Sequence, residues 1–232
     1  MPEPEIDAIV FDVLGTLVDE PAGIRAGIRA QYPSLGDPGV EQLLALWQQH
    51  IAREQRRVLD GDRPYLASGA LDLEAARLVA EAAEAAGTGD PADVAALALS
   101  GRRLPPWPDT VAGLARLAER FPLIGLSNAS RTALLGLNAH AGLRWHQALS
   151  AEDARTYKPD PAVYRLAVTV SGRPPERLLM VAAHAWDLRG AQGLGLRTAY
   201  VSRPVGDPPT PSDEFDLLAD GLADLAEQLG CP

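Results

Sequence analysis

Short apolar runs occur at the start of the chain and, alternating with helical patterns, after residue 104. Residues 8–11 form the first run, which stops at Asp12, and similar runs cover residues 122–126, 148–149, 178–182 and 198–201. A continuous apolar run that ends at polar residues is typical of a strand buried on both faces. Apolar residues at helical spacing lie between the later runs, in residues 110–120, 131–140, 161–170 and 188–194. This alternation predicts an α/β fold, with helices on both faces of a parallel sheet.

Residues 20–104 show helical patterns and no convincing strand. One stripe at helical spacing consists of Leu43, Leu44, Leu46, Trp47 and Ile51, and residues 71–86 and 91–99 predict two further helices. The sequence Pro105-Pro106-Trp107-Pro108 then ends the helical region. We therefore predict a Rossmann-like core made of residues 1–18 and 105–232, with residues 19–104 inserted after the first strand as a helical cap domain.

The composition narrows the classes of partner. The chain has 232 residues and a net charge of −10, which argues against nucleic acid or an anionic membrane surface as a partner. No stretch approaches the roughly 18 uncharged apolar residues of a membrane span. Cys231 is the only cysteine, and residues 1–9 lack the pattern of a signal peptide. These features predict a cytoplasmic protein, and a homodimer is one assembly to consider.

Lys158 is the only lysine, and every other basic residue among the 21 of Lys or Arg type is arginine. Arginine is a wide planar fork, whereas lysine is a compact point charge on a thin stem. A position that keeps lysine indicates a tight pocket in which one ammonium meets carboxylates. The alternative is the chance survival of a surface lysine, but Lys158 lies in a predicted loop, where functional side chains tend to occur.

Polar residues follow several of the predicted strands. Asp12, Ser127 and Asp187 each come after a strand, and Lys158 lies in the loop that leads to the next helix. Ligands of open parallel sheets bind outside the carboxyl ends of the strands, so these four groups should converge on one crevice. Each residue alone could instead serve as a turn residue, a helix cap or a surface carboxylate.

Four segments resemble the four motifs of the haloacid dehalogenase superfamily, in the same order and over nearly the whole chain. They are Phe11-Asp12-Val13-Leu14-Gly15-Thr16-Leu17, Leu126-Ser127-Asn128, Tyr157-Lys158-Pro159-Asp160 and Ala185-Trp186-Asp187. Trp107-Pro108-Asp109, Tyr164 and the Ala-Trp-Asp sequence are most similar to the L-2-haloacid dehalogenase (type II) branch. The resemblance implies hydrolysis of a short anionic 2-haloacid to a 2-hydroxyacid, with no cofactor and no metal.

The resemblance also implies a role for each matching residue. Asp12 would attack the halogen-bearing carbon and form an aspartyl ester, which water then cleaves. Thr16 would hold the nucleophile loop, and Lys158 would keep Asp12 ionised because a nearby cation favours the charged form. Asp187 would orient Lys158, and Tyr164 would brace this network.

The same resemblance assigns the substrate pocket. Ser127 and the backbone after it would bind the substrate carboxylate, and Asn128 would line the same pocket. Leu14 and Trp186 would form an apolar wall around the halogen-bearing carbon.

Leu14 bears on the type of reaction. Phosphatases of this superfamily usually carry Asp two residues after the nucleophile, where it protonates the leaving oxygen and offers its backbone carbonyl to Mg²⁺. Leucine cannot donate a proton, and a halide leaves without one. The sequence therefore favours carbon–halogen hydrolysis, and Mg²⁺ is expected only under the alternative of a small-molecule phosphatase.

Two positions depart from the dehalogenase pattern. Gln48 follows Leu46-Trp47 where the family has an arginine that receives the halide, and Arg53, Arg56 or Arg57 could substitute or form a solvated basic face. His184 replaces an asparagine, and it could donate to the halide, assist the water or pack in the core. A catalytically retired member that binds a small anion or a partner protein is a third alternative.

Overall fold

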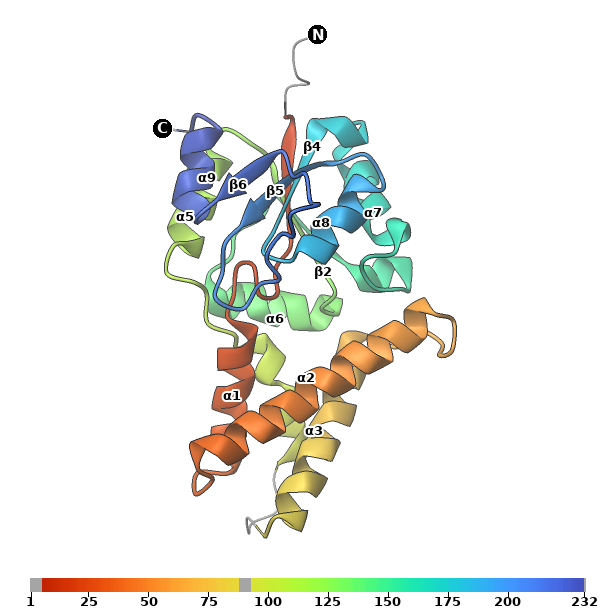
Figure 1. Cartoon of the computed structure of the whole chain (residues 1–232), viewed down its shortest axis with the longest axis vertical. Helices are drawn as coiled ribbons and strands as arrows, with labels where there is room; N and C mark the ends of the chain where they lie inside the picture. Colours follow the sequence, from red (N-terminus) through yellow and green to blue (C-terminus); the bar gives the residue numbers. More distant parts are fainter. Residues whose placement is uncertain (1–5, 88–92, 232) are drawn as a thin grey trace.

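The computed structural model describes residues 6–87 and 93–231 (Figure 1). Six strands of these ranges form one parallel sheet in the order β3-β2-β1-β4-β5-β6. Their bounds are β1 Ala8–Phe11, β2 Leu123–Ser127, β3 Gln147–Ser150, β4 Leu178–Ala182, β5 Arg197–Val201 and β6 Leu217–Ala219. The first strand of the sequence therefore lies in the middle of the sheet, where its carboxyl end is surrounded by loops of neighbouring strands.

The central strands are buried on both sides because helices cover both faces of the sheet. On one face lie α5 (Thr110–Ala118), α6 (Arg131–Ala141) and α9 (Leu222–Gln228), packed with Ile9 and Phe11 in one apolar cluster. On the other face lie α7 (Pro161–Ser171) and α8 (Ala185–Gln192), packed with Ala8 and Val10. Successive residues of β1 thus pack in clusters on opposite faces of the sheet, as the two-residue period of a strand requires.

In the described residues, four helices and a short 3-10 turn form the lower part of the molecule in Figure 1. They are α1 Glu20–Gln31, α2 Asp37–Leu59, α3 Ser68–Ala85, α4 Val94–Ala98 and η1 Ser100–Arg102. The predicted stripe of α2 is the face that packs inward, with Leu43, Leu44 and Trp47 buried. This helical cap interrupts the chain between β1 and the rest of the sheet, so the predicted fold class is confirmed.

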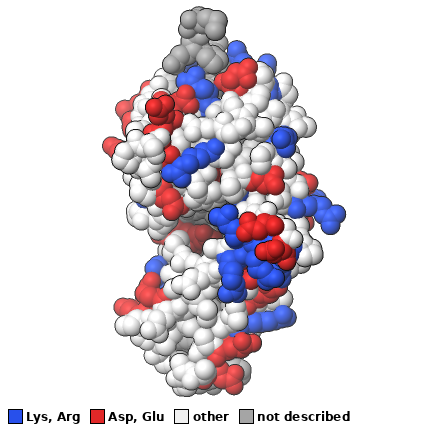
Figure 2. Space-filling model, turned by 45° about the vertical axis from the view of Figure 1, so that its right-hand side comes forward, with Lys and Arg blue, Asp and Glu red and all other residues white. Residues whose placement is uncertain are grey.

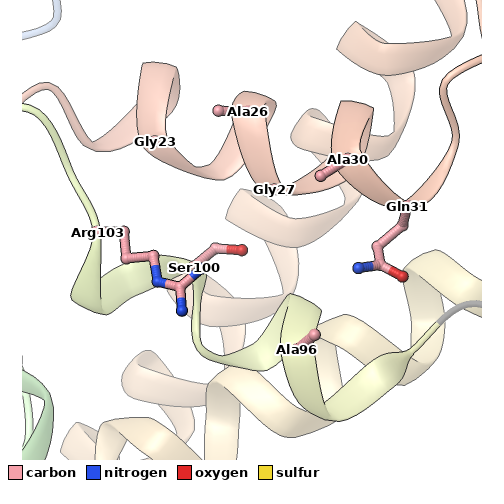
Figure 3. A pocket seen from close by; sticks show the side chains of 8 residues that line it. All are labelled: Gly23, Ala26, Gly27, Ala30, Gln31, Ala96, Ser100 and Arg103. Atoms are coloured by element: carbon pink, nitrogen blue, oxygen red, sulfur yellow. The ribbon is translucent and has the colours of Figure 1, made fainter.

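Small residues let α1 approach the segment from α4 to η1 closely. A Cβ atom on Gly27 would collide with the Ser100 hydroxyl, so only glycine fits at this crossing. A groove of about 210 Å³ runs along the same contact, with Ala26, Ala30 and Ala96 in its wall (Figure 3). None of the predicted site residues lies in this groove, which is a packing feature of the cap.

Two hydrogen bonds join the cap to the core beside the carboxyl edge of the sheet. The Tyr157 hydroxyl donates to the Leu66 carbonyl at 2.6 Å, and the Ser130 backbone N–H donates to the Ser68 hydroxyl at 2.7 Å. Tyr157 precedes Lys158, and Ser130 caps the N-terminus of α6, where its side chain accepts from the Ala133 backbone N–H at 3.3 Å. Both cap contacts therefore end on segments that also shape the crevice.

Several predicted elements have different bounds. The helix expected over 188–194 is α8, which begins at Ala185, so Asp187 lies in its first turn and not in a loop after the strand. The helix expected over 91–99 is α4, Val94–Ala98, with Asp93 as its N-cap and Leu99 as its C-cap, and Pro91 and Ala92 lie outside the described residues. Strand β6 and helix α9 were not predicted, since their short apolar segments give little periodicity. The domain boundaries between residues 18 and 19 and between residues 104 and 105 stay a proposal.

Charge is mixed over the visible surface, which shows no broad basic face (Figure 2). Within the described ranges, no helix combines the length and the apolar character that crossing a membrane requires.

Candidate active site

A buried ion cluster lies at the carboxyl edge of the sheet, beneath the cap. The Lys158 Nζ atom donates to Asp12 Oδ1 at 3.0 Å and to Asp187 Oδ2 at 2.8 Å. The Lys158 side chain is only 1% exposed, and that of Asp187 is fully buried. Burial alone would lower the pKa of Lys158, but the charges of Asp12 and Asp187 outweigh it and raise that pKa above its ordinary value. The lone lysine is therefore a buried cation clamped between two carboxyl groups.

Asp12 is fixed through both of its oxygens. Its Oδ1 atom accepts a hydrogen bond from Lys158, and its Oδ2 atom accepts one of 2.6 Å from the Thr16 hydroxyl. That hydroxyl in turn accepts from the Ala183 backbone N–H at 2.9 Å, and the Asp12 N–H donates to the Val181 carbonyl at 2.9 Å. The carboxylate is thus held in one orientation by groups from three segments, as a preorganised nucleophile requires.

Tyr164 supports the same cluster from α7. Its hydroxyl donates to Asp187 Oδ1 at 2.6 Å and also contacts the Asp187 carbonyl at 3.2 Å. Burial, together with the adjacent Asp187 charge, raises the pKa of Tyr164, so the hydroxyl keeps its proton. Burial also raises the pKa of Asp187, and the charge of Lys158 works against that rise. Both oxygens of Asp187 are therefore occupied, and this carboxyl group orients the lysine.

Ser127 and Asn128 shape the loop after β2. The buried Ser127 hydroxyl accepts from the Ala129 N–H at 3.1 Å, and Asn128 Oδ1 accepts from the Lys158 N–H at 2.9 Å. Asn128 thereby ties the loop after β2 to the loop that carries the lysine. Asn128 therefore contacts the segment that carries the lysine, whereas the Ser127 hydroxyl contacts its own loop.

A cavity of about 40 Å³ separates this edge of the sheet from the cap. Leu14 and Asn128 line it from the core. The residues that line it from α1, α2 and α3 are Glu20, Ile24, Ile51, Gln55, Ser68 and Asp72. Leu14 is therefore an apolar part of the wall of this cavity, and its role toward a substrate stays a prediction.

Sequence reasoning missed the two carboxyl groups in this cavity. Burial and the neighbouring Glu20 charge raise the pKa of Asp72 to about 8, while the charge of Arg102 opposes the rise. Burial likewise raises the pKa of Glu20, although His184 acts against it. Glu20 follows Asp12 and Thr16 closely in the sequence, and this proximity could have identified it. Asp72 is one acidic residue within a helical pattern, and nothing in the sequence distinguished it.

Gln48 and Trp186 are not brought to the cavity. Gln48 is exposed on α2, and the cavity residues of that helix are Ile51 and Gln55. Trp186 is 36% exposed, and its indole N–H donates to Asp207 Oδ2 at 3.1 Å. Neither side chain lines the cavity in this arrangement of cap and core.

The arginines of α2 form a network of their own. Arg53 and Arg57 both donate to the buried Glu54, at 2.9 and 3.0 Å, and Arg63 joins Glu54 to Glu74. Glu54 lies within hydrogen-bond distance of three guanidinium groups, and these, with the hydrogen bond from Arg53 as the largest cause, lower its pKa to about 2. Arg56 is exposed. The positive charge of Arg53 and Arg57 is therefore engaged away from the cavity.

His184 lies directly beside the loop that follows Asp12. Its Nε2 atom is 3.1 Å from the Leu14 carbonyl oxygen, and its Nδ1 atom is 2.7 Å from Asp207 Oδ2. In the described part of the chain, no group of three or more His, Cys, Asp or Glu side chains has a geometry that could hold a metal ion. The Leu14 carbonyl, which a Mg²⁺-dependent member would offer to its metal, is here a hydrogen-bond acceptor.

Known proteins share this architecture. A model of the haloacid dehalogenase-like hydrolase family matches residues 6–195. The (S)-2-haloacid dehalogenase H-109 of Pseudomonas putida is 31% identical over 202 residues, which are 85% of this chain and 86% of that protein. The match extends over most of both sequences.

Solved structures agree with the sequence comparison. The L-2-haloacid dehalogenase PA0810 superimposes with a TM-score of 0.85 at 35% identity, over 97% of this chain and 99% of that one. The L-2-haloacid dehalogenase of Xanthobacter autotrophicus with chloropropionic acid covalently bound gives a TM-score of 0.80 at 28% identity, over 97% and 98%. Family model, relatives and fold coincide on one group, and the chain belongs to the haloacid dehalogenase-like hydrolase family.

Proposed function

We propose that the protein hydrolyses short (S)-2-haloacids to 2-hydroxyacids through an ester of Asp12. The observation that carries the proposal is the buried Lys158 held between Asp12 and Asp187, in a site with Leu14 where a phosphatase places its acid. The substrate named for the relatives, and the chloropropionic acid bound covalently in one of them, support the same reaction.

The first step is a displacement at carbon 2 of the substrate. One oxygen of Asp12 supplies the electron pair for the new C–O bond, and the halide leaves with the pair of the C–X bond. No proton is needed, so a leucine at position 14 is compatible with this step. Lys158 donates to one oxygen of Asp12, and Thr16 donates to the other and aims the carboxylate.

The second step restores the enzyme. Water adds to the side-chain carbonyl carbon of Asp12 and expels the 2-hydroxyacid, so the water oxygen stays in Asp12 and the product takes an aspartate oxygen. Carbon 2 changes bonds only in the first step, and the overall reaction therefore inverts its configuration. Ser127, Asn128 and adjacent backbone groups would hold the substrate carboxylate.

The test compares two leaving groups under two metal conditions. Purified protein is incubated with (S)-2-chloropropionate or with a generic phosphoester, each with Mg²⁺ and with a chelator. We expect chloride release at equal rates in both conditions and no phosphate release. A Leu14→Asp variant, which restores the missing acid, serves as the matched control for the phosphatase chemistry.

Other outcomes of this test would overturn the proposal and assign a different function. Mg²⁺-dependent phosphate release without chloride release would assign a small-molecule phosphatase. Activity in neither assay, together with binding of chloropropionate, would assign a retired member that binds small anions. We place the enzyme in the cytoplasm because its single cysteine cannot form an internal disulfide, and size-exclusion chromatography with light scattering would identify a homodimer.

A further inference from the structure

His184 joins the nucleophile loop to the segment after β5. One ring nitrogen, Nε2, contacts the Leu14 carbonyl oxygen at 3.1 Å, and the other, Nδ1, contacts the Asp207 carboxylate at 2.7 Å. A carbonyl and a carboxylate can only accept hydrogen bonds. Both ring nitrogens must therefore carry a hydrogen if both bonds are made, and a histidine with two N–H groups is a cation.

The carboxylate that holds the ring is itself anchored. Asp207 forms a bridge with His184 through the backbone: the Asp207 N–H donates to the Ala183 carbonyl at 2.9 Å, and the Ala185 N–H donates to the Asp207 carbonyl at 3.0 Å. A Cβ atom on Gly206 would collide with the Ala183 carbonyl, so a glycine precedes Asp207 at this close approach. This β-bridge therefore holds Asp207 next to the ring.

The nucleophile loop is shaped to receive the ring. Gly15 has φ of +78°, and a Cβ atom there would lie 2.5 Å from His184 Nε2. Glycine therefore serves two needs at this position, the left-handed backbone and the space for the imidazole. The ring lies between the loop of the nucleophile and Asp207, with its side chain 17% exposed.

The charged groups around the ring favour a cation. Burial alone would lower the pKa of His184, but the Asp12 charge and the hydrogen bond and charge of Asp207 outweigh it and raise that pKa. The acidic groups that act on the ring are Asp12 after β1, Glu20 of α1, Asp187 of α8 and Asp207 after β5. Two cations lie near the same loop: Lys158 donates to Asp12, and Arg203 Nε donates to the Thr16 carbonyl at 2.9 Å.

We propose that His184, as an imidazolium held by Asp207, is a positioning residue that fixes the nucleophile loop through the Leu14 carbonyl and takes the place of a metal there. A Mg²⁺ ion does not fit this site, because the carbonyl is engaged by a positively charged donor. The loop thereby receives a cationic hydrogen-bond donor from the protein itself. The kinetic part of the proposal rests on the proposed dehalogenase function.

The charge state is tested without turnover. Ring ¹⁵N NMR of the whole protein should show both His184 nitrogens protonated at pH 7.5, and Asp207→Asn should shift the ring titration to lower pH. Isothermal titration with Mg²⁺ should show no binding at millimolar concentrations. A neutral His184 ring at pH 7.5, or tight Mg²⁺ binding that Asp12→Asn abolishes, would overturn the proposal.

The positioning role is tested by variants. We expect His184→Ala to lower kcat for chloropropionate about tenfold to a hundredfold with little change in KM, the loss that corresponds to one charged hydrogen bond. His184→Asn, which keeps a donor for the Leu14 carbonyl, should recover part of kcat. Asp207→Asn should lower kcat only about twofold to fivefold, because the Asp207 side chain is 61% exposed and exposed ion pairs are weak.

His140→Ala, a change at an exposed histidine on α6, is the matched control and should leave kcat and KM unchanged. Full kcat in His184→Ala would overturn the positioning role while leaving the proposed function intact. If the wild-type protein releases no halide but its His184 ring is doubly protonated and Mg²⁺ does not bind, the proposed function fails and the assignment of the imidazolium stands.

Discussion

The core wall of the candidate site, which is the ion cluster of Asp12, Lys158 and Asp187, is built differently from the cap wall, which lines the cavity beside it. On the core side, the carboxyl oxygens of Asp12 and Asp187 each receive a hydrogen bond from Lys158, Thr16 or Tyr164. On the cap side, the carboxyl groups of Glu20 and Asp72 line the cavity with no side-chain hydrogen bond to a described residue. The core wall is therefore held in one arrangement by hydrogen bonds, whereas the carboxyl groups of the cap wall are not.

The difference extends to charge. The core presents one ammonium to two carboxyl groups, which suits a displacement by a carboxylate. The cap presents acidic groups in the region where the family's halide-receiving arginine was expected, and Figure 2 shows acidic side chains inside the crevice at the waist of the molecule. The effects of substitutions on the two walls should accordingly differ in magnitude and in the property that changes.

Asp12→Asn should have the largest effect. An amide is a far weaker nucleophile than a carboxylate, so we expect kcat for chloropropionate to fall by more than about 10⁴-fold. The protein should stay folded, which thermal unfolding would check. A single turnover of the wild type in ¹⁸O-labelled water should place the heavy oxygen in Asp12, as read by mass spectrometry of its peptide. Label found only in the product would point to direct attack by water.

Lys158→Arg should have the second-largest effect on activity. The guanidinium is too wide for the space between Asp12 and Asp187, so Lys158→Arg should lose activity nearly as severely as Lys158→Met, by about a hundredfold to a thousandfold. Breaking a buried charge cluster should also lower the free energy of unfolding by about 3–5 kcal/mol in the Met variant. Urea unfolding and chloride release measure the two effects. An arginine variant with a near-normal rate would show that the lone lysine is an accident of composition.

Asp72→Asn should stabilise the protein. The folded pKa of about 8 exceeds the ordinary value of 3.8, so ionisation of Asp72 favours the unfolded chain. The stability that the protonated group gives is complete below pH 3.8 and is lost as pH rises toward 8. We therefore expect the variant's advantage to grow from pH 4 to pH 8 and reach about 1–2 kcal/mol. Urea unfolding at pH 5 and pH 8 measures it, with the exposed Asp60→Asn as control.

The same titration should affect substrate binding. Above pH 8 the cavity gains a negative charge and repels an anionic substrate, so KM for chloropropionate should rise about threefold to tenfold between pH 7 and pH 9. Asp72→Asn should remove most of that rise and leave kcat nearly unchanged. A rise that persists in the variant would assign the titration to another group.

Gln48→Arg should have the smallest effect. The side chain is exposed and does not line the cavity, so we expect less than a threefold increase in chloride release from a new charge at this distance. An increase of tenfold or more would show that the cap reorganises when substrate binds and brings α2 closer to the leaving group.

The sequence predicted the core wall better than the cap wall for a physical reason. Asp12, Ser127 and Lys158 are adjacent to strand ends or to the turns that follow, and a parallel sheet brings such positions together whatever the details of packing. Glu20 and Asp72 come together only because the packing of the cap brings residues of α1 and α3 to the same cavity. Nothing local to either residue encodes that packing, and position 48 was placed by resemblance to the family.

The partner of His184 was invisible for a similar reason. Asp207 lies in a loop without periodicity, 23 residues from the histidine, and only the backbone bridge to residues 183–185 brings the two side chains together. The long apolar runs of β1, β2 and β4 were recognised because complete burial dictates their composition. Strand β6 has only three residues, of which one is well buried, so its pattern is too weak to identify.

The hydrogen bond from Tyr157 to the Leu66 carbonyl ties the cap to the segment that carries Lys158. A cap that moved away from the sheet would have to break this bond, and the residue that lost its support would be the neighbour of Lys158. The ammonium itself would keep its contacts with Asp12 and Asp187, which both belong to the core. The hydrogen bonds of the ion cluster therefore come from the core alone, whereas the backbone beside it is also held by the cap.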